Sequence, residues 1–423
     1  MRSTKLLTII LVCAVLSLFT SQAQNAPTSI SQFAELIASD GQQNDHLGVA
    51  VAINGTTVVV GAPDHNGQRG SAYVFAKQAD TIRQVAELAA PSGGIPFTYF
   101  GAAVAISGDT VVIGRTGNNQ EPGAVYVFVK PANGWADTTP TATLMPSDSA
   151  GYDQFGSSVA ITGNTIVVGA PRLNTSLPTP GEAYVFMEPP GGWMNMTQTA
   201  TLTASDGTSY AGFGSSVAIN GSTVVVGAPG SQIQQFGQGA GYVFVEPPVG
   251  WQDMTETAKL VAFDPQTANL GAATSIEGNT VVLGAPYYST DFYQQQGAAY
   301  VFVEPTGGWR NSLARARLTA SNGHAFNAFG SSVATTGNVI LVGSPDNLAS
   351  STAAGSAYLD VKPLSGWRTT SFFFAQLMAS DSAASDDFGT SVAIEHGAAV
   401  IGAPGHTVGQ NQGQGAAYVF VPQ

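Results

Sequence analysis

The sequence predicts an all-β fold, a seven-bladed β-propeller whose blades are four-stranded antiparallel sheets. Three observations support it: one unit recurs seven times, Gly and Pro punctuate each copy, and two strands of every copy are joined by a very short turn. The glycines that mark the copies lie 53 to 59 residues apart, at Gly48, Gly101, Gly156, Gly214, Gly271, Gly330 and Gly389. This period indicates an array of one supersecondary unit, whose copies stack because none can bury its apolar face alone.

Each copy contains four predicted strands, which are clearest in the third copy. The innermost strand, at 157–161, alternates polar and apolar residues, whereas the second, at 165–171, is a nearly continuous apolar run that ends Gly-Ala-Pro. The third strand reads Ala-Tyr-Val-Phe at 183–186, and the outermost begins Ala-Thr-Leu-Thr at 200–203. An alternating strand has one covered face, and a continuous apolar run is typical of a strand covered on both faces.

The link between the first two strands is a polar residue followed by Gly in every copy, as in Asn220-Gly221. This is the chemistry of a tight hairpin, because such turns require a positive φ. The first two strands are therefore antiparallel neighbours. Four-stranded antiparallel units repeated around an axis form a propeller, and a parallel solenoid would need much shorter repeats.

The order of strands along the chain predicts how the ring closes. The array begins with a lone outermost-type strand at 35–40 and ends with a third-type strand at 417–420. We therefore expect the N-terminal strand to supply the outermost strand that the last blade lacks. This pairing closes the ring and leaves no open sheet edge between the first and last blades.

Residues 1–23 have the pattern of a secretory signal peptide. Arg2 and Lys5 precede an apolar run of 15 residues at 6–20, and a small-x-small cleavage site follows at 21–23. The alternative is a short membrane anchor, but the run is short for a membrane span. We predict a secreted, extracellular protein (periplasmic in a Gram-negative cell), with a lead-in at 24–34 and one propeller domain at 35–423.

Charge narrows the classes of partner. Without residues 1–23 the chain has 12 Lys and Arg against 27 Asp and Glu, a net charge of −15, and it has no Cys. This charge disfavours nucleic acid and anionic membranes, because positive charge supplies the affinity for both. No second apolar span follows, so we expect no membrane span once the signal is removed. We also expect a monomer.

The loops between the second and third strands share one face of the predicted propeller, and they differ in every copy. Variable loops on a rigid scaffold commonly carry binding residues, so we expect a ligand site on this face; the alternative is that the loops only connect strands. The candidate ligand-binding residues are Asp64, His65, Tyr287, Tyr288, Tyr293, Asp346 and His406. His65 and His406 occupy equivalent positions in the first and last copies, so adjacent blades can bring them together; the alternative is an accidental pair on two loops.

Five of the seven loops that lead into an innermost strand carry aspartates, including Asp40 and Asp45 in the first copy, whereas the loops at 91–100 and 321–329 have none. Paired carboxylates in such a loop can hold Ca²⁺, but an Asp also bonds its own loop backbone in a turn. We favour the turn, because the Asp recurs where a turn is required. Asp381, Asp386 and Asp387 remain as metal candidates, and we expect no cofactor.

The tryptophans all occupy one repeat position in loops of the opposite face: Trp135, Trp193, Trp251, Trp309 and Trp367. A ring of indoles can stack on sugars. A periodic aromatic residue usually packs, however, so we expect each indole to cover the outer edge of its own blade.

The Phe-Gly and Gly-Ala-Pro motifs at this spacing resemble the FG-GAP repeat family, which forms the propeller at the head of integrin α chains and of many bacterial secreted proteins. The resemblance covers residues 35–420 in seven copies, and it implies a propeller that binds extracellular ligands. Integrin-type repeats often bind Ca²⁺ through an Asp-x-Asp-x-Asp-Gly loop between the first two strands. That link is here a two-residue turn such as Asn220-Gly221, so those calcium sites do not carry over.

Two classes of function follow. The chain has no His-Glu-x-x-His and no Gly-x-Ser-x-Gly motif, and its only Cys lies in the signal segment. A non-catalytic binding or adhesion module for an extracellular protein or carbohydrate is favoured, because identical scaffold copies carry divergent polar loops. The alternative is a hydrolase that acts on extracellular glycans in the central depression, which would require a carboxylate pair among the loop aspartates.

Overall fold

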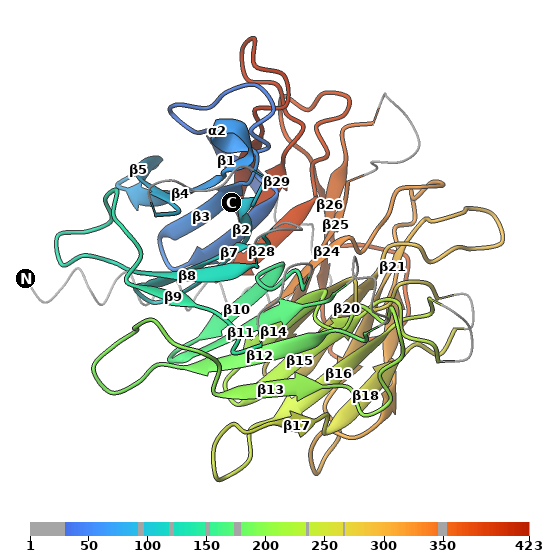
Figure 1. Ribbon diagram of the computed structural model, residues 1–423. Coiled ribbons are helices and arrows are strands. Elements are labelled where there is room, and N and C mark those ends of the chain that lie inside the picture. The colour runs from blue at the N-terminus through green and yellow to red at the C-terminus, as the bar shows by residue number, and fades with distance from the viewer. Residues whose placement is uncertain are drawn as a thin grey trace, which may run out of the picture.

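The computed structural model describes residues 30–91, 97–117, 122–148, 153–172, 179–233, 237–264, 267–345 and 353–422. These residues form seven sheets set around a centre, each with four antiparallel strands, and a single short helix, so the predicted fold class is confirmed (Figure 1). The predicted signal peptide at 1–23 lies outside the described residues. In the described ranges no helix has the length and apolar character needed to cross a membrane.

We number the blades along the chain and give their strands from the centre outward. Blade 1 contains β2 (Ala50–Asn54), β3 (Thr57–Ala62), β4 (Ser71–Gln78) and β5 (Thr81–Ala89), with the one-turn helix α2 (His65–Gln68) between β3 and β4. Blade 2 contains β6 (Phe100–Ser107), β7 (Thr110–Arg115), β8 (Ala124–Val129) and β9 (Ala142–Leu144). Blade 3 contains β10 (Ser158–Thr162), β11 (Thr165–Ala170), β12 (Glu182–Met187) and β13 (Ala200–Thr203).

The remaining blades repeat this order. Blade 4 contains β14 (Ser216–Asn220), β15 (Thr223–Ala228), β16 (Ala240–Val245) and β18 (Ala258–Val261), and blade 5 contains β19 (Ala273–Glu277), β20 (Thr280–Ala285), β21 (Ala298–Val303) and β23 (Ala316–Leu318). Blade 6 contains β24 (Ser332–Thr335), β25 (Val339–Ser344), β26 (Ser356–Val361) and β27 (Ala375–Leu377), and blade 7 contains β28 (Ser391–Glu395), β29 (Ala398–Ala403), β30 (Ala416–Pro422) and β1 (Ile30–Leu36). Two short strands, β17 (Met254–Thr255) and β22 (Ser312–Leu313), pair parallel with β13 and β18.

The first and last strands of the described chain share the sheet of blade 7. β1 lies antiparallel to β30, with Glu35 opposite Tyr418 and Leu36 opposite Ala417, so the blue and red parts of the ribbon meet (Figure 1). Successive innermost strands contact one another around the ring, and β2 contacts β28 where blades 1 and 7 meet. Within the described residues β1 spans Ile30–Leu36, so it includes part of the expected lead-in, with Ile30 opposite Pro422 of β30.

The second motif glycine of each copy approaches the backbone of the first motif glycine in the next copy. A Cβ atom on Gly227 of β15 would lie 2.0 Å from the carbonyl oxygen of Gly271 in the next blade, so only glycine fits there. Gly271 has a φ of +89°, which glycine adopts without steric cost, and its N–H donates to the Gly284 carbonyl at 2.9 Å. The same approach recurs in the pairs Gly61–Gly101, Gly114–Gly156, Gly169–Gly214, Gly284–Gly330, Gly343–Gly389 and Gly402–Gly48.

The apolar core lies between the sheets. Between blades 3 and 4, for example, Val167 and Val185 belong to the same cluster as Phe213 and Phe244. Phe213, from the Phe-Gly motif, packs edge-on against Phe244 with ring centroids 6.0 Å apart. Full burial of one such side chain stabilises the fold by about 1.5–3 kcal/mol. The Phe-Gly motif therefore places a large apolar side chain and a close backbone approach side by side.

The tryptophans are packing residues, as predicted, but their position differs from the prediction. Trp193, Trp251, Trp309 and Trp367 are between 3% and 7% exposed. Trp251 belongs to the cluster that joins blades 3 and 4, and so it lies between two blades rather than at the edge of its own. Asp253, two residues later, accepts the Thr201 N–H of blade 3 at 2.8 Å. This loop thereby covers the outer strand of the neighbouring blade.

Candidate functional site

A polar cluster recurs beneath the loops of one face, which we call the loop face. The loop face carries the loops that join the second and third strands, including 63–70, 286–297 and 404–415, and the loops that enter the innermost strands. In blade 4 the Tyr242 hydroxyl donates to Asp206 at 2.9 Å, and in blade 5 the Tyr300 hydroxyl donates to Asp264 at 3.0 Å. The Tyr comes from the third strand and the Asp from the entering loop, so the repeat itself brings the two together.

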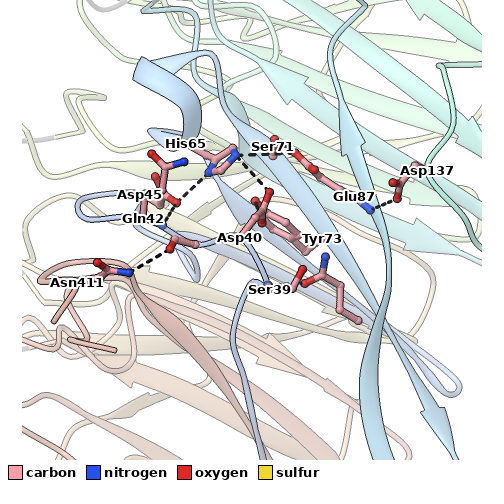
Figure 2. Close-up of polar contacts among 12 residues, drawn as sticks. Ser39, Asp40, Gln42, Asp45, His65, Ser71, Tyr73, Glu87, Asp137 and Asn411 are labelled. Carbon is pink, nitrogen blue, oxygen red and sulfur yellow. Dashed lines mark hydrogen bonds and ion pairs between the residues drawn. The ribbon is translucent and has the colours of Figure 1, made fainter. Parts of the chain in front are cut away.

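In blade 1 this cluster contains a buried histidine. His65, which follows the Gly-Ala-Pro motif, is 3% exposed, and its Nδ1 lies 2.8 Å from Asp45 Oδ2. Its Nε2 lies 3.7 Å from Asp40 Oδ2 and 3.9 Å from Glu87 Oε1. Figure 2 shows the imidazole between Asp45 on one side and Asp40 with Glu87 on the other, beside Tyr73. The hydrogen bond to Asp45 raises the pKa of His65, although burial lowers it.

Blade 7 repeats this arrangement with different residues. His406 is 7% exposed, and its Nδ1 lies 3.1 Å from Asp386 Oδ2. Its Nε2 lies 3.7 Å from Glu35 Oε1 and 3.7 Å from Asp381 Oδ2. Burial, and then the nearby Asp381 carboxylate, raise the pKa of Glu35. Glu35 comes from β1, so pairing of the N-terminal strand with β30 supplies one member of this cluster.

The predicted residues His65 and His406 thus hold equivalent positions, but each has its own carboxylates. Asp381 and Asp386 both lie beside His406. Asp386 also accepts the Ala383 N–H of its own loop at 2.7 Å, which is the turn role expected of these aspartates. Asp387 belongs to neither cluster of possible metal ligands; burial, then Asp386, raise its pKa, whereas His46 lowers it.

Asp64 pairs with His46 at the same face. Asp64 Oδ2 lies 2.6 Å from His46 Nδ1. This hydrogen bond raises the pKa of His46, against the opposing effect of burial. Asp64 is partly exposed, and its bond to His46 joins the loop after β3 to the loop that enters β2.

Other blades place a permanent cation in the corresponding cluster. In blade 3 the Arg172 guanidinium lies 3.2 Å from Asp148, 3.3 Å from Asp153 and 2.9 Å from Glu182. In blade 4 the Lys259 ammonium pairs with Asp206. Burial alone would raise the pKa of Asp206, but the hydrogen bonds from Lys259 and Tyr242 lower it below its ordinary value.

The loop of blade 5 places aromatic side chains at the surface. Phe292 is 89% exposed, Tyr287 is 43% exposed and Tyr293 is 39% exposed. Tyr288 points elsewhere: it is 4% exposed, and its hydroxyl accepts a hydrogen bond of 2.7 Å from Arg317. Tyr288 thus belongs to the buried polar cluster and not to the exposed surface. The predicted Asp346 lies outside the described residues.

A pocket of about 330 Å³ adjoins these aromatic residues. It lies between the loop of blade 5 and the loop that leads into blade 6, and its lining includes Phe292, Tyr293, Gln296, Asn322, His324 and Ser371. The Tyr293 and His324 rings meet edge-on with centroids 6.0 Å apart. No Asp, Glu, Lys or Arg occurs among the described residues of this lining. The pocket thus offers aromatic faces, amides and hydroxyls.

Sequence reasoning missed Glu35 and Glu87, although a signal was present. Both stand between Ala and Leu in an outermost strand, opposite the Tyr of the third strand. Blades 4 and 5 have Lys259 and Arg317 at this place. A glutamate there coincides with a histidine after Gly-Ala-Pro in the same blade, and this pairing is readable from the sequence.

The comparison with protein families identifies the repeat. The sequence model described as the FG-GAP repeat matches residues 30–75, 82–128, 138–186, 196–244, 254–302, 313–359 and 372–420. Together these segments cover more than half of the chain. No curated protein matches it.

Proposed function

Since the chain belongs to the FG-GAP repeat family, we propose that it is a secreted, non-catalytic binding module that recognises an extracellular ligand through the loop face. Signal-like residues 1–23 support secretion. Among extracellular ligands, an uncharged glycan fits the loop face best. The observation that carries this proposal is the pocket beside Phe292 and Tyr293.

The exposed aromatic residues of this loop support ligand contact. A Phe side chain that is 89% exposed buries almost none of its apolar surface, so it adds little to the stability of the fold. Clustered exposed aromatic residues beside a pocket are typical of recognition surfaces. Tyr287 and Tyr293 of the same loop extend this surface.

The polar groups of the pocket favour a sugar over a charged ligand. A sugar presents C–H faces that pack on aromatic rings and hydroxyls that bond to amides and hydroxyls. Gln296 donates to the Ala320 carbonyl at 3.1 Å, which ties the two loops together. Asn322 donates to Gln376 at 3.1 Å. These bonds hold the pocket walls before any ligand arrives, which lowers the entropic cost of binding.

A glycan array tests the proposal, with a panel of extracellular proteins as the second arm. We expect the wild-type chain to bind an uncharged glycan, and Phe292→Ala with Tyr293→Ala to weaken binding at least tenfold, which corresponds to about 1.4 kcal/mol. The matched control is Leu364→Ala, because Leu364 is also 89% exposed but lies in a loop of the opposite face. Binding that survives the double substitution, or that is lost in the control, would contradict this assignment.

A further inference from the structure

The His–carboxylate clusters of blades 1 and 7 have the donor atoms of a metal centre. In blade 1 the ligand atoms of Asp40, His65 and Glu87 lie within 4.8 Å of one another. In blade 7 the atoms of Glu35, Asp381 and His406 meet the same limit. One imidazole nitrogen and two carboxylates form a donor set used by divalent transition metals. A single ion can therefore bridge each triad after small side-chain movements.

The orientation of the imidazole is a second, independent observation. His65 is held by Asp45, which is itself 4% exposed and accepts the Gln42 N–H of its loop at 2.6 Å. This bond occupies Nδ1 and turns Nε2 toward Asp40 and Glu87 (Figure 2). Metal-ligating histidines characteristically bond a carboxylate through the second ring nitrogen, which fixes the ring and its tautomer.

The spacing around Nε2 leaves room for an ion. Its nearest carboxylate oxygens are 3.7 and 3.9 Å away, beyond the usual length of a hydrogen bond. A metal ligated by both groups lies about 2.0–2.2 Å from each ligand atom, so ligand atoms stand between about 3 and 4 Å apart around it. In blade 7 the two corresponding distances from His406 are 3.7 Å.

The other blades serve as internal controls. Lys259 stands opposite Tyr242 where Glu87 stands opposite Tyr73, and Arg317 stands opposite Tyr300. Where the outermost strand supplies a cation, the loop supplies no histidine. Blades 1 and 7 combine the histidine with an added glutamate, so their clusters hold three carboxylates around one imidazole.

We propose that blades 1 and 7 contain two equivalent binding sites for a divalent transition metal such as Zn²⁺. Asp40, His65 and Glu87 are the protein ligands in blade 1, and Glu35, Asp381 and His406 are those in blade 7. In these blades the ion balances the charge of the carboxylates, as Lys259 and Arg317 do in blades 4 and 5. The imidazole ligand selects Zn²⁺ over Ca²⁺, which prefers oxygen ligands.

The test measures Zn²⁺ binding to the full chain after removal of metals with EDTA. Calorimetry should find two ions per chain, and Zn²⁺ should raise the Tm, because the folded clusters bind it. Ser231 follows Gly-Ala-Pro in blade 4 at the position that His65 holds in blade 1. His65→Ser with Glu87→Lys therefore copies Ser231 and Lys259 of blade 4, and should reduce the stoichiometry from two ions to one. The matching pair in blade 7, His406→Ser with Glu35→Lys, should also leave one site, and all four substitutions should leave none.

Two further measurements keep the result decisive. Circular dichroism reports whether each variant folds, and His65→Gln provides a milder change if the paired substitution does not. Ca²⁺ at the same concentrations should leave the Tm unchanged. No Zn²⁺ binding by the wild-type chain would overturn the proposal, and so would two ions bound by the fourfold variant. The first result would show that these clusters do not bind the ion, and the second would place the bound ions elsewhere in the protein.

Discussion

Blades 1 and 4 have the same polar frame and differ in the source of positive charge. Tyr73 and Tyr242 each donate to an aspartate of the entering loop, over 3.0 and 2.9 Å. Blade 4 then supplies Lys259 from its outermost strand, whereas blade 1 has Glu87 at that place and His65 in the loop. The repeat thus specifies the backbone, and one or two side chains determine which charged groups each blade contains.

The shared frame depends on the glycines between blades, and replacing one of them should lower the stability of the protein more than any other change considered below. Gly227→Val should destabilise the protein by roughly 4 kcal/mol or prevent folding, because the new Cβ would lie 2.0 Å from the Gly271 carbonyl. Urea unfolding measures the difference. Gly221→Asn is the control: a Cβ atom on Gly221 would meet nothing within 4 Å, and Asn tolerates its φ of +56°. Equal stability of Gly227→Val and wild type would refute this role of the motif.

Blade 6 differs from the other blades by a carboxyl group buried in its third strand. Asp360 holds the position of Phe302 in blade 5, and burial raises its pKa to about 7. Between these two pKa values, the folded state keeps a proton on Asp360 that the unfolded state, with its ordinary pKa of 3.8, has released. Stability from this group is complete below about pH 4 and is lost as the pH rises to about 7, by an amount of a few kcal/mol.

Asp360→Asn should remove that pH dependence, because the amide does not titrate. At about pH 8 we expect the free energy of unfolding of the variant to exceed that of the wild type by about 2 kcal/mol, and near pH 4 we expect the two to be equal. Asp80→Asn, in an exposed turn, is the matched control and should change neither value. Chemical denaturation at several pH values across this range provides the test. An unchanged slope in Asp360→Asn would assign the pH dependence to other groups.

Replacing the cation of blade 4 by a carboxylate should have a smaller effect on stability. Lys259→Glu places a second carboxylate beside Asp206 and should destabilise the metal-free protein by about 1 kcal/mol, since the pair is partly exposed. Lys259→Met, which keeps the aliphatic stem, should cost less. Thermal unfolding in EDTA at low and high salt measures both, and the difference should shrink at high salt. A variant Lys259→Glu as stable as Lys259→Met would show that charge at this place is unimportant.

The fold was predictable because its determinants recur in every copy. The Phe-Gly and Gly-Ala-Pro motifs encode the packing of Phe213 and the approach of Gly227 to Gly271, and both are visible as a period. The place of Trp251 was not, because no spacing along the chain tells which neighbouring blade a loop covers. That information lies only in the arrangement of the ring.

The site was predictable in part. His65 and His406 stood out because they follow the same motif, but Glu35 and Glu87 lie on outermost strands, far from the loops in sequence. Antiparallel pairing alone brings each glutamate opposite a Tyr and hence beside the histidine. Tyr288 was expected at the surface with Tyr287 and Tyr293, but Arg317 beneath the loop gives its hydroxyl a buried partner.

X-ray anomalous scattering at the zinc absorption edge, from crystals of the full chain grown with Zn²⁺, would locate the ions in blades 1 and 7. We expect two peaks, one between Asp40, His65 and Glu87 and one between Glu35, Asp381 and His406, with no peak beside Arg172, Lys259 or Arg317. The absence of density at both histidines in crystals saturated with Zn²⁺ would contradict the proposed metal sites.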